Sequence, residues 1–164
     1  MKLKLLVGAI LLSSATFANE TPITGTVQSK CVITTDTPGI YGNPTPSVLS
    51  TDPADGGVQP IVRFDVAIAD FYKAAIAIPN DFSSAPSLSD TITWDGEVSV
   101  AEVSDAQMAA YDTEKRLYNN ITEIDLSVAG SVWFKVDSTA SYGYDKSLPA
   151  GNYNAVVNAE CIAN

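Results

Sequence analysis

In Ile61-Val62-Arg63-Phe64-Asp65-Val66-Ala67-Ile68-Ala69-Asp70, apolar and polar side chains alternate, and this stretch indicates the class of structure. The apolar residues Val62, Phe64, Val66 and Ile68 share one face of an extended chain, opposite Arg63, Asp65 and Ala67. A period of two is typical of a β-strand that buries one face and exposes the other. The stretch is therefore predicted to be a half-buried strand.

The same alternation recurs in five further parts of the chain. They are Ala74, Ile76 and Ile78; Ile92, Trp94, Val98 and Val100; Ile124, Leu126 and Val128; Val132, Phe134 and Val136; and Tyr153, Ala155, Val157, Ala159 and Cys161. Short strands separated by turns, with at most one short helix, predict an all-β protein. We expect an immunoglobulin-like antiparallel β-sandwich, with a jelly roll as the alternative. A length of 164 residues suits one such domain.

Glycines at two junctions predict tight hairpins. Three-residue loops at 94–96 and 128–130 would each place a glycine in the left-handed conformation that such loops need. The facing pairs would be Ile92 with Val98 and Leu126 with Val132. The alternative is that these segments are consecutive strands joined across two sheets.

Two other regions differ in character. Residues 34–60 hold five prolines and four glycines, which predicts a loop with one short edge strand near Ser47-Val48-Leu49. Residues 105–118 follow Ser104 as a candidate N-cap, with Gln107 reaching back toward it, and predict a short helix.

The first residues have the pattern of a secretory signal peptide. Lys2 and Lys4 precede an apolar run at 5–12, and small residues lead to Ala18, after which we expect cleavage. The apolar run is too short to span a bilayer as a helix, and the alternative is an amphipathic anchor. Removal of both lysines leaves 7 Lys+Arg against 19 Asp+Glu, a net charge of −12.

Export changes the interpretation of the two cysteines. In an oxidising compartment, Cys31 and Cys161 most simply form one disulfide between the first and last strands. Because Cys161 shares the inward face of the last strand, this disulfide makes those two strands neighbours. The alternative is a pair of free thiols used in catalysis or metal binding.

The composition argues against nucleic-acid binding and against enzyme activity. The acidic balance is unsuited to nucleic acid, because phosphate recognition needs clustered Lys and Arg. The chain has no His, which removes the commonest general base and zinc ligand. We therefore expect no enzyme activity, catalytic residue, metal or cofactor, although the acidic loop at 52–56 leaves weak calcium binding open.

The segment that follows the cleavage site also alternates. Ile23, Gly25 and Val27 have one parity, and threonines lie on the other. A glycine within a strand marks close approach of another backbone or side chain, so we expect tight packing at Gly25. The alternative is an ordinary edge strand of its own domain.

The layout resembles that of bacterial chaperone–usher pilus subunits, nearest to the major pilins of colonisation-factor-type fimbriae. The resemblance rests on the alternating segment Thr21–Gln28, the Trp94-Asp95-Gly96 element, and a closing strand at 148–157 that contains Ala-Gly-Asn-Tyr. It covers most of the chain after the signal peptide.

This resemblance implies an incomplete sandwich that a strand from the next subunit completes. Ile23, Gly25 and Val27 would be the donor side chains, and copies of the chain would form a head-to-tail filament. The chain would divide into a signal peptide at 1–18, an N-terminal extension at 19–30 and a pilin domain at 31–164. A periplasmic chaperone and an outer-membrane usher would be its partners before it reaches the extracellular fimbrium and serves adhesion.

A second function remains open. A self-complete secreted β-sandwich could bind a carbohydrate or a protein through its loops. Tyr142-Gly143-Tyr144 is a candidate loop for such binding, because exposed tyrosines often stack on ligands. The alternative is that these tyrosines pack within the domain.

Overall fold

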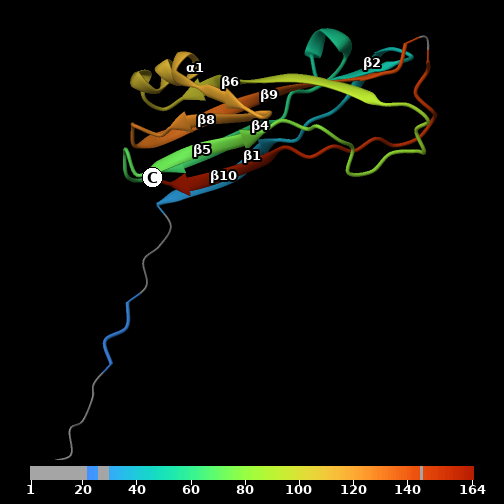
Figure 1. The fold of residues 1–164 in the computed structure, drawn as a ribbon. Coiled ribbons are helices and arrows are strands. Elements are labelled where there is room, and N and C mark those ends of the chain that lie inside the picture. Colours follow the sequence, from blue (N-terminus) through green and yellow to red (C-terminus); the bar gives the residue numbers. More distant parts are fainter. Residues whose placement is uncertain (1–21, 26–29, 145) are drawn as a thin grey trace, which may run out of the picture.

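The computed structural model describes residues 22–25, 30–144 and 146–164, and the signal-peptide prediction lies outside these residues. Two antiparallel sheets pack face to face (Figure 1). The six-stranded sheet contains β1 (Cys31–Thr37), β4 (Ile61–Val66), β9 (Gly130–Tyr142), β3 (Val48–Ser50), β2 (Gly42–Thr45) and β6 (Ile92–Val103). The four-stranded sheet contains β10 (Asn158–Ala163), β5 (Tyr72–Ala77), β8 (Ile121–Asp125) and β7 (Arg116–Tyr118). The predicted antiparallel β-sandwich is confirmed.

Strand β9 organises the larger sheet. Its 13 residues pair with β6 along one side, and with β4 and then β3 along the other. Strand β3 is the short strand predicted near residue 48, but it is not at an edge, because β2 covers it.

The core lies between the sheets and follows the predicted alternation, except that Ile68 lies beyond the end of β4 and is 44% exposed. Val62, Phe64 and Val66 of β4 are buried, and the ring of Phe64 meets that of Phe134 edge to face at 5.6 Å. Ile76 of β5 and Ile124 of β8 close the core from the other sheet. Burial of these side chains is the main stabilising contribution to the sandwich.

Both predicted hairpins are wrong. Ile92 pairs with Tyr142 rather than Val98, because 92–103 is one continuous strand. β8 pairs with β5 and β7, and the chain then crosses to the other sheet at Gly130. Gly130 does have a positive φ of 142°, but at a crossover between sheets rather than in a hairpin.

The helical region is shorter than predicted. A 3-10 turn at Ala106–Ala110 leads into a single α-helical turn, α1 (Tyr111–Glu114), and residues 116–118 form β7. Asp105, not Ser104, caps the turn by accepting a hydrogen bond from the Gln107 N–H. The Ser104 hydroxyl instead accepts one from the Ser131 N–H. Another 3-10 turn spans Pro53–Asp55. In the described part of the chain, no helix is long and apolar enough to cross a membrane.

Candidate functional site

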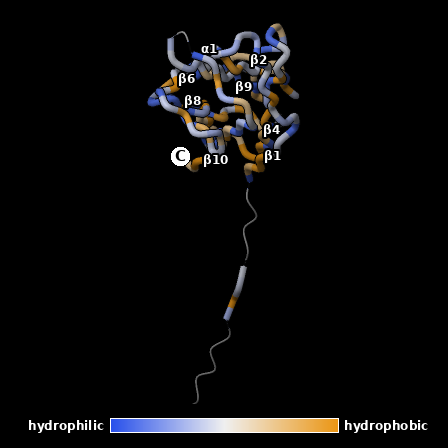
Figure 2. Tube along the Cα trace, turned by 90° about the vertical axis from the view of Figure 1, so that its right-hand side faces the viewer, coloured by the Kyte–Doolittle hydropathy of each residue, from blue (hydrophilic) through white to orange (hydrophobic). Residues whose placement is uncertain are grey.

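The first and last strands lie on the same side of the sandwich. β1 is an edge of the six-stranded sheet and β10 is an edge of the four-stranded sheet, and Figures 1 and 2 place them next to each other. The predicted disulfide joins Cys31 to Cys161 with a Cα–Cα distance of 6.3 Å. The two sheets are therefore bonded covalently at one end of this open side.

The free edge of β1 directs backbone groups toward this open side. The N–H of Ala67 donates to the C=O of Lys30, so Lys30–Ala67 and, two residues on, Val32–Asp65 are the hydrogen-bonded pairs of this ladder. By the same alternation, Ile33 points its N–H and C=O away from β4. Among the described residues, none forms a hydrogen bond with these groups of Ile33.

Strand β10 presents a matching free edge. The N–H of Asn164 donates to the C=O of Phe71, and alternation along the β10–β5 ladder turns the N–H and C=O of Ala159 outward. Residues 155–157, which precede the strand, form no backbone hydrogen bond with another described residue. Two unpaired edges therefore face the same opening.

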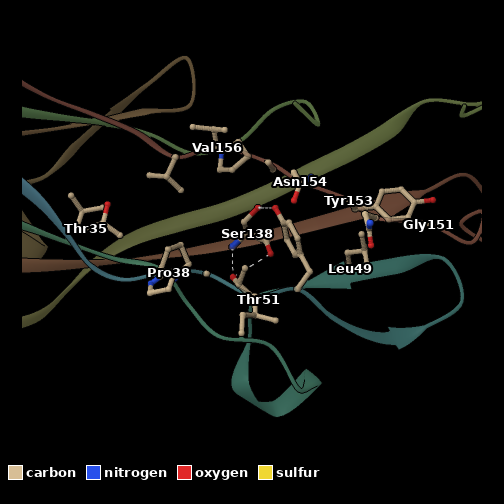
Figure 3. A pocket seen from close by; sticks show the side chains of 18 residues that line it. Thr35, Pro38, Leu49, Thr51, Ser138, Gly151, Tyr153, Asn154 and Val156 are labelled. Carbon is tan, nitrogen blue, oxygen red and sulfur yellow. Dashed lines mark hydrogen bonds between the residues drawn. The ribbon is translucent and has the colours of Figure 1, made fainter. Parts of the chain in front are cut away.

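A groove of about 680 Å³ lies between the segment that begins at Thr35 in β1 and the segment that precedes β10 (Figure 3). One wall is formed by residues 151–157, and the other by Thr35 and residues 38–41. The floor comes from the six-stranded sheet. It contains Leu49, Thr51, Val62 and Ser138, all buried except where they meet the groove.

The floor has a polar end. The Tyr41 hydroxyl and the Ser138 hydroxyl share a hydrogen bond of 2.8 Å, and the Ser138 N–H donates to the Thr51 hydroxyl at 2.9 Å. Burial raises the pKa of Tyr41 above 10.0, although the hydrogen bond with Ser138 acts in the opposite direction. Tyr41 is therefore a neutral phenol at neutral pH.

Aromatic rings close the same end of the groove. Phe82 meets the rings of Trp94 and Tyr153 at centroid distances of 4.7 and 5.1 Å, and that of Tyr41 at 6.5 Å. Trp94 was predicted to lie in a hairpin loop, whereas it belongs to β6 within this cluster. The cluster holds the 151–157 wall against the six-stranded sheet.

The predicted donor residues do not pack on the domain. Ile23 is 98% exposed, and no described atom lies within 4 Å of the position a Cβ would take on Gly25. Residues 22–25 lie apart from the sandwich (Figure 2), and Val27 is outside the described residues. The structure therefore does not bring Ile23 or Gly25 to the groove of their own chain.

The predicted tyrosine loop divides into two environments. Tyr142 is buried, and its hydroxyl accepts a hydrogen bond from the Ser89 N–H. Tyr144 is 92% exposed. Tyr142 therefore packs within the domain, and of these two tyrosines only Tyr144 is accessible for a contact with another molecule.

Several groove residues were not predicted from the sequence. Tyr41 and Thr51 come from the proline- and glycine-rich region, which has no periodicity that would predict burial. The even spacing of Tyr153, Ala155 and Val157 was an available signal, because these half-buried residues continue the inward face of β10 before its pairing begins.

The described residues offer no evident metal site. Among the described residues, no three Cys, Asp or Glu side chains gather as a metal site. Asp52 of the acidic loop accepts a hydrogen bond from the Ala54 N–H and caps the turn at 53–55.

No protein-family model, curated protein or solved structure matches this chain.

Proposed function

We propose that this chain is a structural subunit of an extracellular fimbria and that it polymerises by donor-strand exchange. Its N-terminal segment at 19–30 would lie in the groove of the next copy. The observation that carries this proposal is the groove between Thr35 of β1 and residues 155–157, which form no backbone hydrogen bond with another described residue. The outward-facing backbone groups of Ile33 lie two residues before Thr35 on the same edge. An added strand would satisfy both edges at once.

The properties of the N-terminal segment support the proposal. Ile23 and Gly25 are fully accessible to another molecule. The alternating segment Thr21–Gln28 has eight residues and the 151–157 wall has seven, so their lengths differ by one residue. A head-to-tail contact of this kind does not close on itself and produces a filament.

Export and assembly follow from the same proposal. The signal-peptide pattern would direct the chain to the periplasm, where a chaperone would cover the groove. An outer-membrane usher would then exchange the chaperone strand for the segment of the next subunit. The assembled fimbria would serve surface adhesion.

Truncation tests the proposal directly. The mature chain and a chain lacking residues 19–28 are compared by electron microscopy and sedimentation. The mature chain should form fibres, and the truncated chain should remain monomeric with the same disulfide. Fibres of the truncated chain would contradict donor-strand exchange through this segment.

A peptide of residues 19–30 provides the complementary test. Added to the truncated chain, it should raise the melting temperature and slow hydrogen exchange at Ile33 and Val157. The matched control is a peptide with Ile23 and Thr24 exchanged and Thr26 and Val27 exchanged, which moves both apolar side chains to the other face. Equal effects of both peptides would count against insertion in a fixed register.

One observation favours the alternative, a self-complete secreted module that binds a carbohydrate or a protein. Phe64, Ile76 and Phe134 are fully buried without an added strand. If the truncated chain is fully stable and neither peptide changes its melting temperature, this second function is the better explanation.

A further inference from the structure

Strand β6 is the longest free edge of the sandwich. It pairs with β9 on one side, and on the other side no described strand pairs with it (Figure 1). A long, unpaired edge normally accepts another strand and leads to aggregation. An edge of 12 residues is therefore expected to pair with another strand unless other groups block it.

The register identifies the backbone groups on this edge. The Val136 N–H donates to the C=O of Pro60, and the Ser138 C=O accepts from the Thr51 N–H, so both residues direct these groups away from β6. Their partners on β6 are Val98 and Gly96. In an antiparallel ladder, those partners also point their own groups away from β9, as does Val100 in the same parity.

Side chains bind three of these outward groups. The Gly96 N–H donates to Asp95 Oδ1 at 2.8 Å, and the Val100 N–H donates to Asp112 Oδ1 at 3.0 Å. Between them, Lys115 Nζ donates to the Val98 C=O at 2.7 Å. Three of the hydrogen-bonding positions that an incoming strand would use, at the centre of the edge, are therefore occupied.

Asp112 and Lys115, two of the three residues that bind the β6 edge, are held in place by the turn that follows β6. Asp112 lies in α1 and Lys115 directly follows it, so the chain folds back along the edge it has just formed. Lys115 Nζ also contacts Glu97 Oε1 at 2.7 Å and Asp112 Oδ1 at 3.5 Å. A register shift between Val100 and Glu102 further disrupts the edge.

Other edges are short or unsuited to pairing. β7 has three residues, and β2 has four with Pro44, which lacks an N–H. Among the described residues, the groove is lined by Thr35 of β1 and by residues 151–157, which precede β10.

We infer that Asp95, Asp112 and Lys115 close the β6 edge to strand addition by a second copy of this chain. Without them, two β6 strands would pair antiparallel about a two-fold axis. This inference does not depend on the proposed function, because it concerns a different edge and predicts a dimer rather than a fibre.

The test is a triple variant, Asp95→Ala, Asp112→Ala and Lys115→Met, made in the mature chain and also in the chain lacking residues 19–28, in which fibres through the N-terminal segment cannot add to the association measured. Methionine keeps the apolar stem of Lys115 and removes its ammonium group. The matched control is Lys73→Met, Glu123→Ala and Asp125→Ala, which makes the same charge change on the outer face of the four-stranded sheet. Sedimentation gives the association state, and hydrogen exchange at Gly96 and Val100 identifies the paired edge.

The triple variant should form dimers that increase with concentration, and its Val100 amide should exchange several-fold more slowly in concentrated than in dilute samples. The control and the parent chain should show no such dependence at Val100. A folded triple variant without added association overturns the inference, as does association that leaves Gly96 and Val100 unprotected. If the triple variant does not fold, Asp112→Ala alone is measured against Glu123→Ala by the same criteria.

Discussion

Cys31 and Cys161 are 130 residues apart in the sequence, yet their disulfide joins the edge strands of the two sheets. β1 and β10 share no ladder, since β1 pairs with β4 and β10 with β5. The bond therefore fixes one end of the opening that continues into the groove.

Removal of this disulfide should lower the free energy of unfolding by about 4 to 5 kcal/mol in the chain-entropy model, because a loop of this length gains much freedom in the unfolded chain. The double variant Cys31→Ala, Cys161→Ala is compared with the parent chain by urea unfolding. Reduction of the parent chain should give a similar loss. Equal midpoints for oxidised and reduced protein would contradict this expectation.

Burial of the Tyr41 hydroxyl should make the stability of the fold depend on alkaline pH. Because the folded pKa of Tyr41 is raised above 10.0, its contribution is fully present below 10.0 and is lost as the pH rises through the folded pKa. The folded state holds this proton longer than the unfolded state does. Unfolding measured from pH 8 to 12 should show the decline, and Tyr41→Phe should lack this component.

Ser138→Ala provides a second measurement at the same pair. It leaves the half-buried Tyr41 hydroxyl without its partner and should cost about 1 to 2 kcal/mol. Since the lost hydrogen bond lowered the pKa of Tyr41, that pKa should rise further, which ultraviolet absorbance of the phenolate can detect. A fall in this pKa would contradict the assigned contact.

A charge in the groove wall should block strand insertion without unfolding the domain. Val157→Asp places a carboxylate where an inserted strand would bury it, and burial of an unpaired charge is costly. Fibre formation and binding of the 19–30 peptide should both fail. Circular dichroism checks that the variant is folded.

Ile162→Asp is the matched control for this variant. Ile162 is also β-branched and lies near Val157 in the sequence, but it faces solvent from β10. It should assemble as the parent chain does. Loss of assembly in both variants would indicate a general effect of added negative charge.

Gly96→Ala should destabilise the larger sheet. A Cβ at this position would lie 2.4 Å from the backbone oxygen of Asp137, so one of the paired strands must move. We expect a loss of about 1 to 3 kcal/mol, the range for steric overpacking. Thr93→Ala at an exposed position of β6 should change stability by less than about 0.5 kcal/mol. Chemical unfolding of both variants measures the difference.

The sequence predicted strand faces better than strand partners. Alternation identified Val62, Phe64 and Val66 as inward residues, because the pleat makes this a local property. It could not show that Ile92 faces Tyr142, 50 residues away, rather than Val98. A glycine between two apolar runs fits either a hairpin or close approach of another backbone, and Gly96 is the latter.

The sequence predicted only part of the candidate site, because alternation gives the face of a residue but not its distant partners. The cysteines indicated that β1 and β10 are neighbours, and the parity of Val157 placed it on the inward face of the last strand. Tyr41 and Ser138 meet across 97 residues, and Tyr41 lies in a region without periodicity. Only the tertiary structure brings such residues together.

The position of the disulfide also determines how the domain would respond to tension. The chain enters the sandwich at Cys31, so a pull on the preceding residues would arrive at the end of β1. Alone, β1 would peel from β4 one hydrogen bond at a time. Because Cys31 is bonded to Cys161, part of the force passes to β10 and β5 in the other sheet. A pull on one edge strand is thereby shared between both layers.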